Sequence, residues 1–437
     1  MKKEIQIYDF VSALSETIDL VSPFLSSHHK KVAYIAYNIA QKMNISNANT
    51  QDIVLASMLH DIGAFSIGER IKAQSFDDNN MKQNHHALLG YELLKGFEPL
   101  KKAATLIKYH HICYDPYKSG IPIGSYIICL ADRVSVLFDE YQEILGQVPK
   151  VFEKIVLKYN RFHPDVFIAF NHLVKLEYIW VEAFSPSSGS DTIKKVLFLK
   201  EKINLDTLHN FAHVIAQIID FRSRFTATHS SGVAAVAKEL TIISGFPDQE
   251  CKLMEIAGLL HDLGKLAISN DILEKNEKLS TEELNTIKKH TYYTYSILRK
   301  VSGMEELTLW ASHHHERNDG NGYPFHVKGK QFSKLARIMA VADVITALAE
   351  NRPYRQGMAR EEVIETLFDM ANNGIVDSNI VELAAENFFR INDARIKAQE
   401  KAQEKYETFG NIADNFVSSL LTDPRLTKQE ETHENQI

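Results

Sequence analysis

The segment His313–Pro324 reads HHHERNDGNGYP and carries the densest signal in the chain. Three histidines and a glutamate end a run with helical character, and Gly320 and Gly322 then favour a break in the helix. The chain restarts in an extended form, because the residue before Pro324 is disfavoured in the helical region. Imidazoles at a helix end beside a glycine-built loop indicate metal ligands next to the wall of a substrate site. A solvated, histidine-rich helix end is the alternative when this segment is taken alone.

The histidine pattern of this segment belongs to a repeat that runs through the whole chain. Seven histidine and aspartate positions recur in the same order, with small insertions of the kind that surface loops tolerate. The first copy contributes His28, His60, Asp61, His86, His110, His111 and Asp132, and the second contributes His229, His261, Asp262, His290, His314, His315 and Asp343. Two apolar scaffolds that carry the same polar positions predict a duplicated domain.

The segments around these positions have helical periodicity. Apolar residues recur at i, i+3, i+4 and i+7 over residues 32–39, 233–240 and 253–260. Alternation typical of strands is limited to residues 195–199 and 121–128. The sequence therefore predicts an all-α fold of two tandem helical bundles.

Composition shifts suggest where the domains end. We expect a first domain at residues 1–184, a linker at 185–204 that begins with SPSSGSD, and a second domain at 205–410 that starts on a joining helix at 205–222. Residues 394–406 are rich in Ala, Glu, Lys and Gln and predict an exposed helix. Residues 411–437 are expected to comprise a helix end and a disordered polar tail.

The composition is that of an ordinary globular protein, with 45% hydrophobic and 24% charged residues. A cytoplasmic location is expected, because no apolar run reaches the roughly 18–20 residues of a membrane span and no signal peptide opens the chain. Three scattered cysteines without CxxC spacing argue against disulfides and thiolate metal sites. The net charge of −7 disfavours a nucleic-acid polymer as partner but permits a small anionic substrate.

The seven positions of the second copy have the composition of a metal centre. Imidazoles and carboxylates within apolar helices are costly to bury unless they are paired or bound. A mixed set suits iron, manganese, nickel or zinc, and seven ligands suit two ions better than one. Two adjacent ions are a recurrent device in phosphoryl chemistry. Any one of these residues taken singly would be interpreted as an ordinary packing or capping residue.

The second copy also contains HDLGK at 261–265, HHER at 314–317, GYP at 322–324 and RPYR at 352–355. In this order the motifs resemble the HD-GYP branch of the HD superfamily of metal-dependent phosphohydrolases. The resemblance implies an enzyme of second-messenger signalling that hydrolyses cyclic di-GMP, or a related cyclic dinucleotide such as cyclic GMP-AMP, to the linear dinucleotide. A non-catalytic cyclic-nucleotide receptor and a general HD nucleotidase are the alternatives.

The resemblance also implies roles for individual residues. His229, His261 and Asp343 would hold one ion, and His290, His314 and His315 the other. Asp262 would bridge the two ions and hold the nucleophilic water. Lys265 would contact the scissile phosphate, Arg352 and Arg355 would add cationic contacts, and Tyr323 would line the base pocket.

One departure from the family pattern bears on the number of ions. Family members with three metals carry a glutamate four residues before the first histidine, and here that position is Phe225. Two divalent ions, iron or manganese in preference to nickel or zinc, are therefore expected.

The first copy keeps all seven ligand positions but lacks the substrate contacts. Ala64 stands in place of Lys265, no GYP follows His110-His111, and Tyr141 occupies the spacing of Arg352. A second metal site is thus expected in a degenerate domain with a regulatory or dimerising role, and a homodimer is one oligomeric state that this role would suit. His29, His85 and His313 stand beside predicted ligands and are assigned no role.

Overall fold

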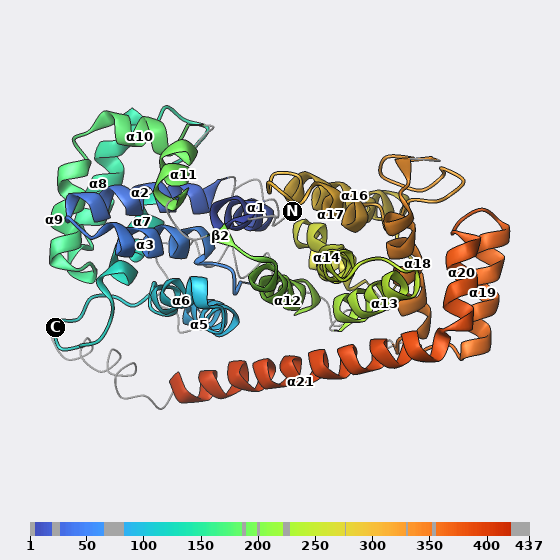
Figure 1. The fold of residues 1–437 in the computed structure, drawn as a ribbon. Helices are drawn as coiled ribbons and strands as arrows, with labels where there is room; N and C mark the ends of the chain where they lie inside the picture. Colours follow the sequence, from blue (N-terminus) through green and yellow to red (C-terminus); the bar gives the residue numbers. More distant parts are fainter. Residues whose placement is uncertain are drawn as a thin grey trace. The chain divides into compact units, whose positions relative to one another are not determined.

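The computed structural model describes residues 5–19, 27–64, 83–185, 189–198, 202–221, 228–275, 277–328, 331–351 and 355–420. The chain divides into two compact units, shown with their helices in Figure 1. The first unit comprises residues 22–201 and 407–437 and contains the first copy of the repeat. The second unit comprises residues 1–21 and 202–406 and contains the second copy. None of the described helices has the length and apolarity needed to span a membrane.

The first unit is built around α2 (His28–Lys42), which packs against α3 (Asn47–Leu59) and α7 (Ile123–Ser135). Apolar residues of α2 such as Val32, Ala36 and Ile39 are fully buried, as their helical spacing predicts. The surrounding helices are α5 (Gln83–Leu94), α6 (Lys101–Lys108), α8 (Val148–Val156), α9 (Pro164–Leu173), α10 (Glu177–Ala183) and α11 (Ser190–Phe198).

The second unit repeats this plan around α13 (His229–Ile243), which packs against α14 (Asp248–Leu260) and α18 (Lys334–Ala349). The unit also contains η5 (Leu263–Ala267), α15 (Asn270–Leu273), α16 (Thr281–Leu298), α17 (Glu305–Ser312), α19 (Arg360–Asn372) and α20 (Ser378–Glu386). Ser280 and Glu283 form a capping box that starts α16, and the Ser333 hydroxyl caps α18. These caps fix the starts of the two helices that carry His290 and Asp343.

The all-α prediction is confirmed, since the described sheet consists of β1 (Ile5–Gln6) and β2 (Lys202–Ile203) alone. The strand-like interpretation is wrong for the described residues of 121–128 and 195–199, and residue 199 lies outside the described residues. Residues 123–128 begin α7, and residues 195–198 end α11. The α7 helix is buried on nearly every side, so its sequence lacks the polar face that would have marked it as a helix.

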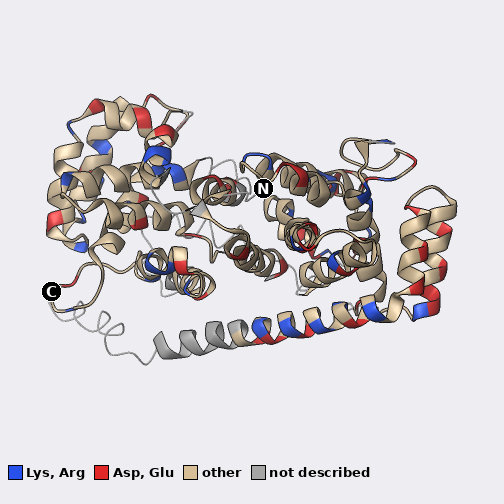
Figure 2. Ribbon diagram, viewed as in Figure 1, with Lys and Arg blue, Asp and Glu red and all other residues tan. Residues whose placement is uncertain are grey.

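The joining helix and the exposed C-terminal helix are both present. The former is α12 (Leu205–Phe221), and the latter lies within α21 (Phe388–Leu420). Figure 2 shows charges of both signs along the described part of α21, as a solvated helix requires. The predicted disordered tail, after residue 420, lies outside the described residues.

The unit boundaries differ from the predicted domain boundaries at the N-terminus. Helix α1 (Ile7–Asp19) packs against α16 and η5, and β1 pairs antiparallel with β2, so residues 1–21 group with the second copy. The expected linker at 185–204 contains α11, which packs on α2 and α3. No local sequence pattern identifies which copy α1 covers, because its apolar face would suit either bundle.

A single aromatic pair tests this grouping. Phe10 of α1 is 2% exposed and lies 4.8 Å, between ring centroids, from Phe211 of α12. We expect Phe10→Ala to destabilise the second unit by about 3–5 kcal/mol, since the substitution leaves a cavity. Each unit contains one of the two tryptophans, Trp180 in the first and Trp310 in the second. Urea unfolding followed by fluorescence in Trp180→Phe and Trp310→Phe backgrounds therefore reports each unit separately.

Phe389→Ala serves as the matched control, because Phe389 is 76% exposed and its removal should change stability by no more than about 0.5 kcal/mol. If Phe10→Ala lowered the urea midpoint only in the unfolding curve reported by Trp180, the grouping of α1 with the second copy would be contradicted.

Candidate metal centre

The seven predicted ligands of the second copy converge in the core of the second unit. His229 begins α13, His261 directly follows α14, and Asp343 lies in the middle of α18. His229 Nε2 lies 3.2 Å from Asp343 Oδ1, and His261 Nε2 lies 3.2 Å from Asp262 Oδ2. One atom each of His229, His261 and Asp343 lie within 4.8 Å of one another, close enough to share an ion.

A second group of three histidines lies on the other side of Asp262. His290 comes from α16, whereas His314 and His315 follow the end of α17. His290 Nε2 lies 3.1 Å from His314 Nε2, and their distances to Asp262 Oδ1 are 3.4 and 3.9 Å. Asp262 thus directs one carboxylate oxygen to each group, which is the geometry required of a bridging ligand.

Backbone carbonyls set the orientation of the histidines. The Nδ1 atoms of His261, His290 and His314 lie 2.7, 2.6 and 2.7 Å from the carbonyl oxygens of Gly258, Ile287 and Ala311. A carbonyl only accepts, so Nδ1 must carry the proton, and the Nε2 lone pair is left to face the centre. Metal-binding histidines are held in this way, because the hydrogen bond at one nitrogen fixes the tautomer at the other.

Glu350 performs the same task for His229, although the sequence did not predict a role for it. Its carboxylate oxygens lie 3.1 and 3.2 Å from His229 Nδ1, and Gln399 of α21 donates to the same carboxylate at 3.1 Å. Burial lowers the pKa of His229, but Glu350 and Asp343 outweigh burial and raise that pKa to about 10. The only sequence signal for Glu350 is its position just before the RPYR motif.

The electrostatics of the centre fit divalent cations. Burial lowers the pKa of His290 to about 3 and that of His314 well below its usual range, so both stay neutral and able to bind a metal. Burial raises the pKa of Asp262, but His261 and Lys265 outweigh burial and lower that pKa well below its usual range, which keeps the carboxyl ionised. Among the described residues, Asp262 Oδ1 is fully buried and accepts no hydrogen bond, which a bound cation would remedy.

The glycine of the HDLGK motif allows the two groups to approach each other. A Cβ atom at Gly264 would overlap the carbonyl oxygen of His290, so any other residue would push α16 away. The Gly264 N–H also donates a hydrogen bond of 3.0 Å to the Thr294 hydroxyl on the same helix. The glycine therefore sets the distance between Asp262 and His290.

Of the predicted substrate-binding residues, Lys265 and Tyr323 lie beside residues of the metal centre, whereas Arg355 is bound to the backbone. Lys265 Nζ lies 2.5 Å from Asp262 Oδ2 at the edge of the centre. The Tyr323 ring lies 5.0 Å from the His315 ring, between centroids, and is half-buried. Arg355 donates at 2.6 Å to the carbonyl of Ala347, so its guanidinium is held by the backbone here, and Arg352 and Phe225 lie outside the described residues.

Glu316 organises the loop that carries Tyr323 and also lacked a predicted role. This buried carboxylate accepts hydrogen bonds from the backbone N–H groups of Phe325, His326 and Val327 at 2.6, 3.1 and 3.2 Å. The loop is thereby tied to the turn that follows α17. The HHER motif contained this residue, but only the tertiary contacts reveal what it does.

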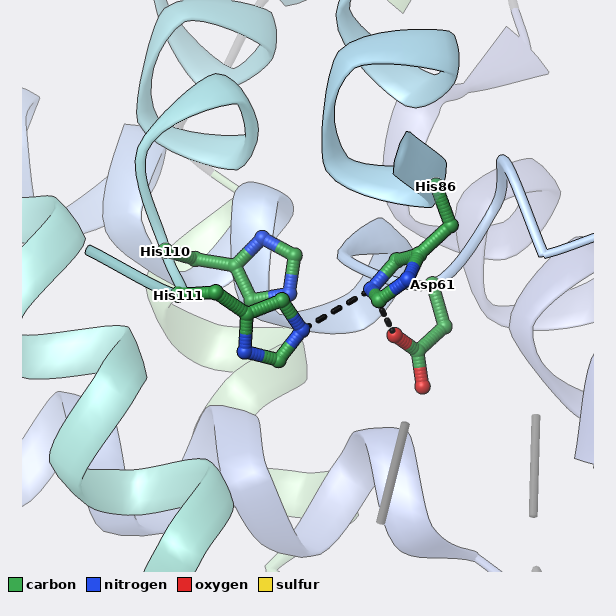
Figure 3. Close-up of side chains that lie close together, drawn as sticks. All are labelled: Asp61, His86, His110 and His111. Carbon is green, nitrogen blue, oxygen red and sulfur yellow. Dashed lines mark hydrogen bonds and ion pairs between the residues drawn. The ribbon is translucent and has the colours of Figure 1, made fainter. Parts of the chain in front are cut away.

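The first copy assembles a corresponding cluster in the first unit. Its ligand positions occupy equivalent elements: His28 begins α2, His60 directly follows α3, His86 lies in α5, and Asp132 lies in α7. Figure 3 shows the group formed by Asp61, His86, His110 and His111, with His86 Nε2 lying 3.1 Å from Asp61 Oδ1 and 2.9 Å from His111 Nε2. Asp61 again lies between two groups, because His60 Nε2 is 3.4 Å from its other oxygen.

The first cluster differs from the second in the charges around it. The buried Arg133 guanidinium lies 3.4 Å from His111 Nδ1, whereas the second copy has Val344 at the matching position after Asp343. Ala64, fully buried, stands where Lys265 extends toward Asp262. The first copy therefore has the ligands but a different arrangement of cations.

Comparisons with known proteins agree with this division. Family models described as HD domain match residues 25–137 and 213–380. The chain is 30% identical over 390 residues to 3′3′-cGAMP-specific phosphodiesterase 1 of Vibrio cholerae, covering 86% of this chain and 90% of the relative. It is also 35% identical over 156 residues to the cyclic di-GMP phosphodiesterase response regulator RpfG of Xanthomonas campestris, covering 35% and 41% of the two chains.

The fold is shared with a solved structure of a cyclic GMP-AMP specific phosphodiesterase of V. cholerae. The TM-score is 0.61 at 19% identity, and the match covers 88% of this chain and 98% of that one. Together with the HDLGK and GYP motifs around the metal centre, these matches identify the chain as a member of the HD-GYP branch of the HD-domain phosphodiesterases, with a second HD domain ahead of its HD-GYP domain.

Proposed function

We propose that the second HD domain hydrolyses a cyclic dinucleotide to the linear dinucleotide, with 3′,3′-cyclic GMP-AMP as the preferred substrate. The observation that carries this proposal is the placement of Asp262, whose two oxygens face separate groups of metal-ligand histidines. The near full-length match to a 3′3′-cGAMP-specific enzyme supports the choice of substrate. Partial matches cover 35% and 36% of this chain for two cyclic di-GMP phosphodiesterases, and 36% and 43% for two further 3′3′-cGAMP-specific enzymes, so the substrate choice depends on the near full-length match.

Each residue of the centre then has a chemical task. When bound, the two divalent ions, iron or manganese, supply Lewis-acid activation of water and neutralise charge on the phosphate. His229 and the three histidines whose tautomers are fixed by carbonyls hold their lone pairs in position before substrate arrives. Asp262 orients the attacking water between the two groups. The oxygen of water loses a proton and forms a bond to phosphorus while the bond from phosphorus to the 3′ oxygen breaks. The 3′ oxygen takes up a proton and becomes a hydroxyl, which opens the ring.

Lys265 and Tyr323 define the side from which the substrate enters. The ammonium of Lys265 already lies beside the Asp262 carboxylate and can instead face a phosphate oxygen, where it offsets the charge that develops during attack. The half-buried Tyr323 ring offers a flat apolar surface for a base beside His315. Arg352 and Arg355 complete the cationic set in this proposal, with Arg355 leaving the Ala347 carbonyl when a phosphate binds.

The first HD domain holds a metal but does not contribute to hydrolysis in this proposal. Metals alone can activate water, yet a phosphodiester must also be held in line with the attacking oxygen. The first copy lacks both the lysine and the GYP loop that would hold it. The expected cytoplasmic location and the homodimer remain predictions from the sequence.

The division of labour can be tested by mirrored double substitutions. His261→Ala with Asp262→Ala should abolish hydrolysis, because both ion positions of the second domain lose a ligand. His60→Ala with Asp61→Ala should leave a measurable share of the activity. The assay is turnover of cyclic GMP-AMP and of cyclic di-GMP by metal-loaded protein, with the products separated by chromatography.

Each double variant is the control for the other. Equal losses would mean that the two copies act as one coupled site. Binding of a cyclic dinucleotide without turnover in the unaltered protein would favour a receptor, and turnover of mononucleotides alone would favour a general nucleotidase.

Lys265 should act on the substrate and not on the metal. We expect Lys265→Ala to lower kcat/KM by about 100-fold, the loss typical of removing one group that stabilises developing charge, with metal content unchanged. The control is Lys397→Ala, because the Lys397 side chain is 72% exposed on α21, where it pairs with Asp393. A fall in bound metal in Lys265→Ala would assign this lysine to the integrity of the centre.

Glu350 should act on the metal through His229. Glu350→Gln keeps the size of the side chain but removes the negative charge beside His229 Nδ1, so metal affinity should fall by about 10–100-fold. Metal titration of the metal-free protein measures this loss, and excess metal should restore most of the turnover. Glu365→Gln, the same substitution on the surface of α19, is the control. Unchanged affinity in Glu350→Gln would show that the hydrogen bond to His229 has no role in metal binding.

A further inference from the structure

A third imidazole faces the ion position formed by His28 and His60 in the first domain. His29 is the second residue of α2 and is only 1% exposed. Its ring centroid lies 5.0 Å from that of His60 and 5.3 Å from that of His28. His29 Nε2 lies 4.0 Å from Asp61 Oδ2. This side chain is therefore a member of the cluster, although it lies outside the seven repeated positions.

The distances are those of ligands around a single ion. Two atoms that each lie about 2.1 Å from one ion are about 3 Å apart when adjacent and about 4.2 Å apart when opposite. His28 Nε2 lies 3.3 Å from Asp132 Oδ1, and His60 Nε2 lies 3.4 Å from Asp61 Oδ2. The 4.0 Å separation of His29 Nε2 from Asp61 Oδ2 falls at the upper end of the same range, as expected for ligands on opposite sides.

The second domain has no imidazole at this position. Because His28 aligns with His229, His29 aligns with Ser230. The Ser230 hydroxyl is fully buried and donates a hydrogen bond of 2.7 Å to Asp220 Oδ1 on α12. The shorter side chain is thus committed to α12 and supplies no imidazole to the ion position.

We propose that His29 is an additional ligand that closes the coordination sphere of the metal ion in the first HD domain. With His29, the five side chains His28, His29, His60, Asp61 and Asp132 surround the ion. Structural metal sites are closed in this way, whereas catalytic sites keep one position open for water or substrate. His29 in the first domain and Ser230 in the second thus distinguish a structural metal site from a catalytic one on the same fold. This inference rests on the proposed binding of metal by the first domain.

The test counts exchangeable water on bound Mn²⁺ in the full-length chain. Substitutions His261→Ala and Asp262→Ala remove the centre of the second domain, and His86→Ala removes the other group of the first domain. His213→Ala removes the group of His209, His213 and Glu255, whose ligand atoms lie within 4.8 Å of one another, and the position of His28, His29 and His60 is then left for Mn²⁺. Water-proton relaxation reports whether a water molecule on the ion exchanges with solvent.

We expect little relaxation enhancement per bound Mn²⁺ in this background and a clear gain when His29→Ser is added. The added substitution should also weaken Mn²⁺ affinity by at least about 10-fold. His172→Ser is the matched control, because His172 is exposed on α9 of the same unit and should alter neither quantity. Strong enhancement already present with His29 in place, or unchanged affinity in His29→Ser, would overturn the role of His29.

The metal content of the variant that carries only His261→Ala and Asp262→Ala separately tests the underlying proposal. Bound Mn²⁺ that is lost when His60→Ala and Asp61→Ala are added supports a metal in the first domain, whatever His29 does, because the group of His209, His213 and Glu255 stays intact in both variants. The absence of such Mn²⁺ would overturn both the metal and the additional ligand.

Discussion

The structure of each unit depends on one buried carboxylate placed between two groups of histidines. Asp262 and Asp61 are 2% and 3% exposed, and an ionised carboxyl at such depth is costly unless opposite charge surrounds it. The histidines come from helices that are far apart in the sequence, so all of those helices must meet at one point. The helix caps and the glycine at position 264 position these helices, and the backbone carbonyls orient the imidazoles toward the common point.

Much of this centre could be predicted because its residues are marked by pattern alone. Chance rarely places histidines and aspartates in the same order on two sets of apolar helices, so the repeat identified these positions as a common set of ligands. Glu350 and Glu316 could not be predicted in the same way, since single glutamates are common and their roles arise from contacts with His229 and with the backbone of residues 325–327. The α7 helix was misread in part as a strand because burial on nearly every side removed its polar face. The placement of α1 in the second unit depends on tertiary packing, which the sequence of α1 does not reveal.

The two units show how one scaffold can keep its ligands and lose its substrate contacts. Lys265 is replaced by Ala64, which is fully buried, while Val344 corresponds to the buried Arg133. The second copy carries its positive charge on Lys265 at the edge of the centre, where a phosphate could reach it. The first copy instead carries a positive charge on Arg133, beside His111 Nδ1. Burial lowers the pKa of His111 well below its usual range, and Arg133 adds to this effect. A neutral His111 can still bind metal, and the Arg133 guanidinium lies beside it.

The persistence of all seven ligands in the first domain has a physical reason that does not require catalysis. Burial lowers the pKa of His60, but Asp61 and Asp132 outweigh burial and raise that pKa to about 9. A protonated His60 therefore offsets part of the negative charge of the two carboxylates. Protonation of His60 does not satisfy every atom, because the buried Nε2 atom of His110 has no hydrogen-bond partner among the described residues. A cation satisfies such atoms together, and it stabilises the fold because it binds the folded state alone. Loss of the ion would leave several buried polar groups unpaired at about 1–3 kcal/mol each. Bound metal in the first domain would therefore stabilise the fold whether or not that domain hydrolyses a substrate.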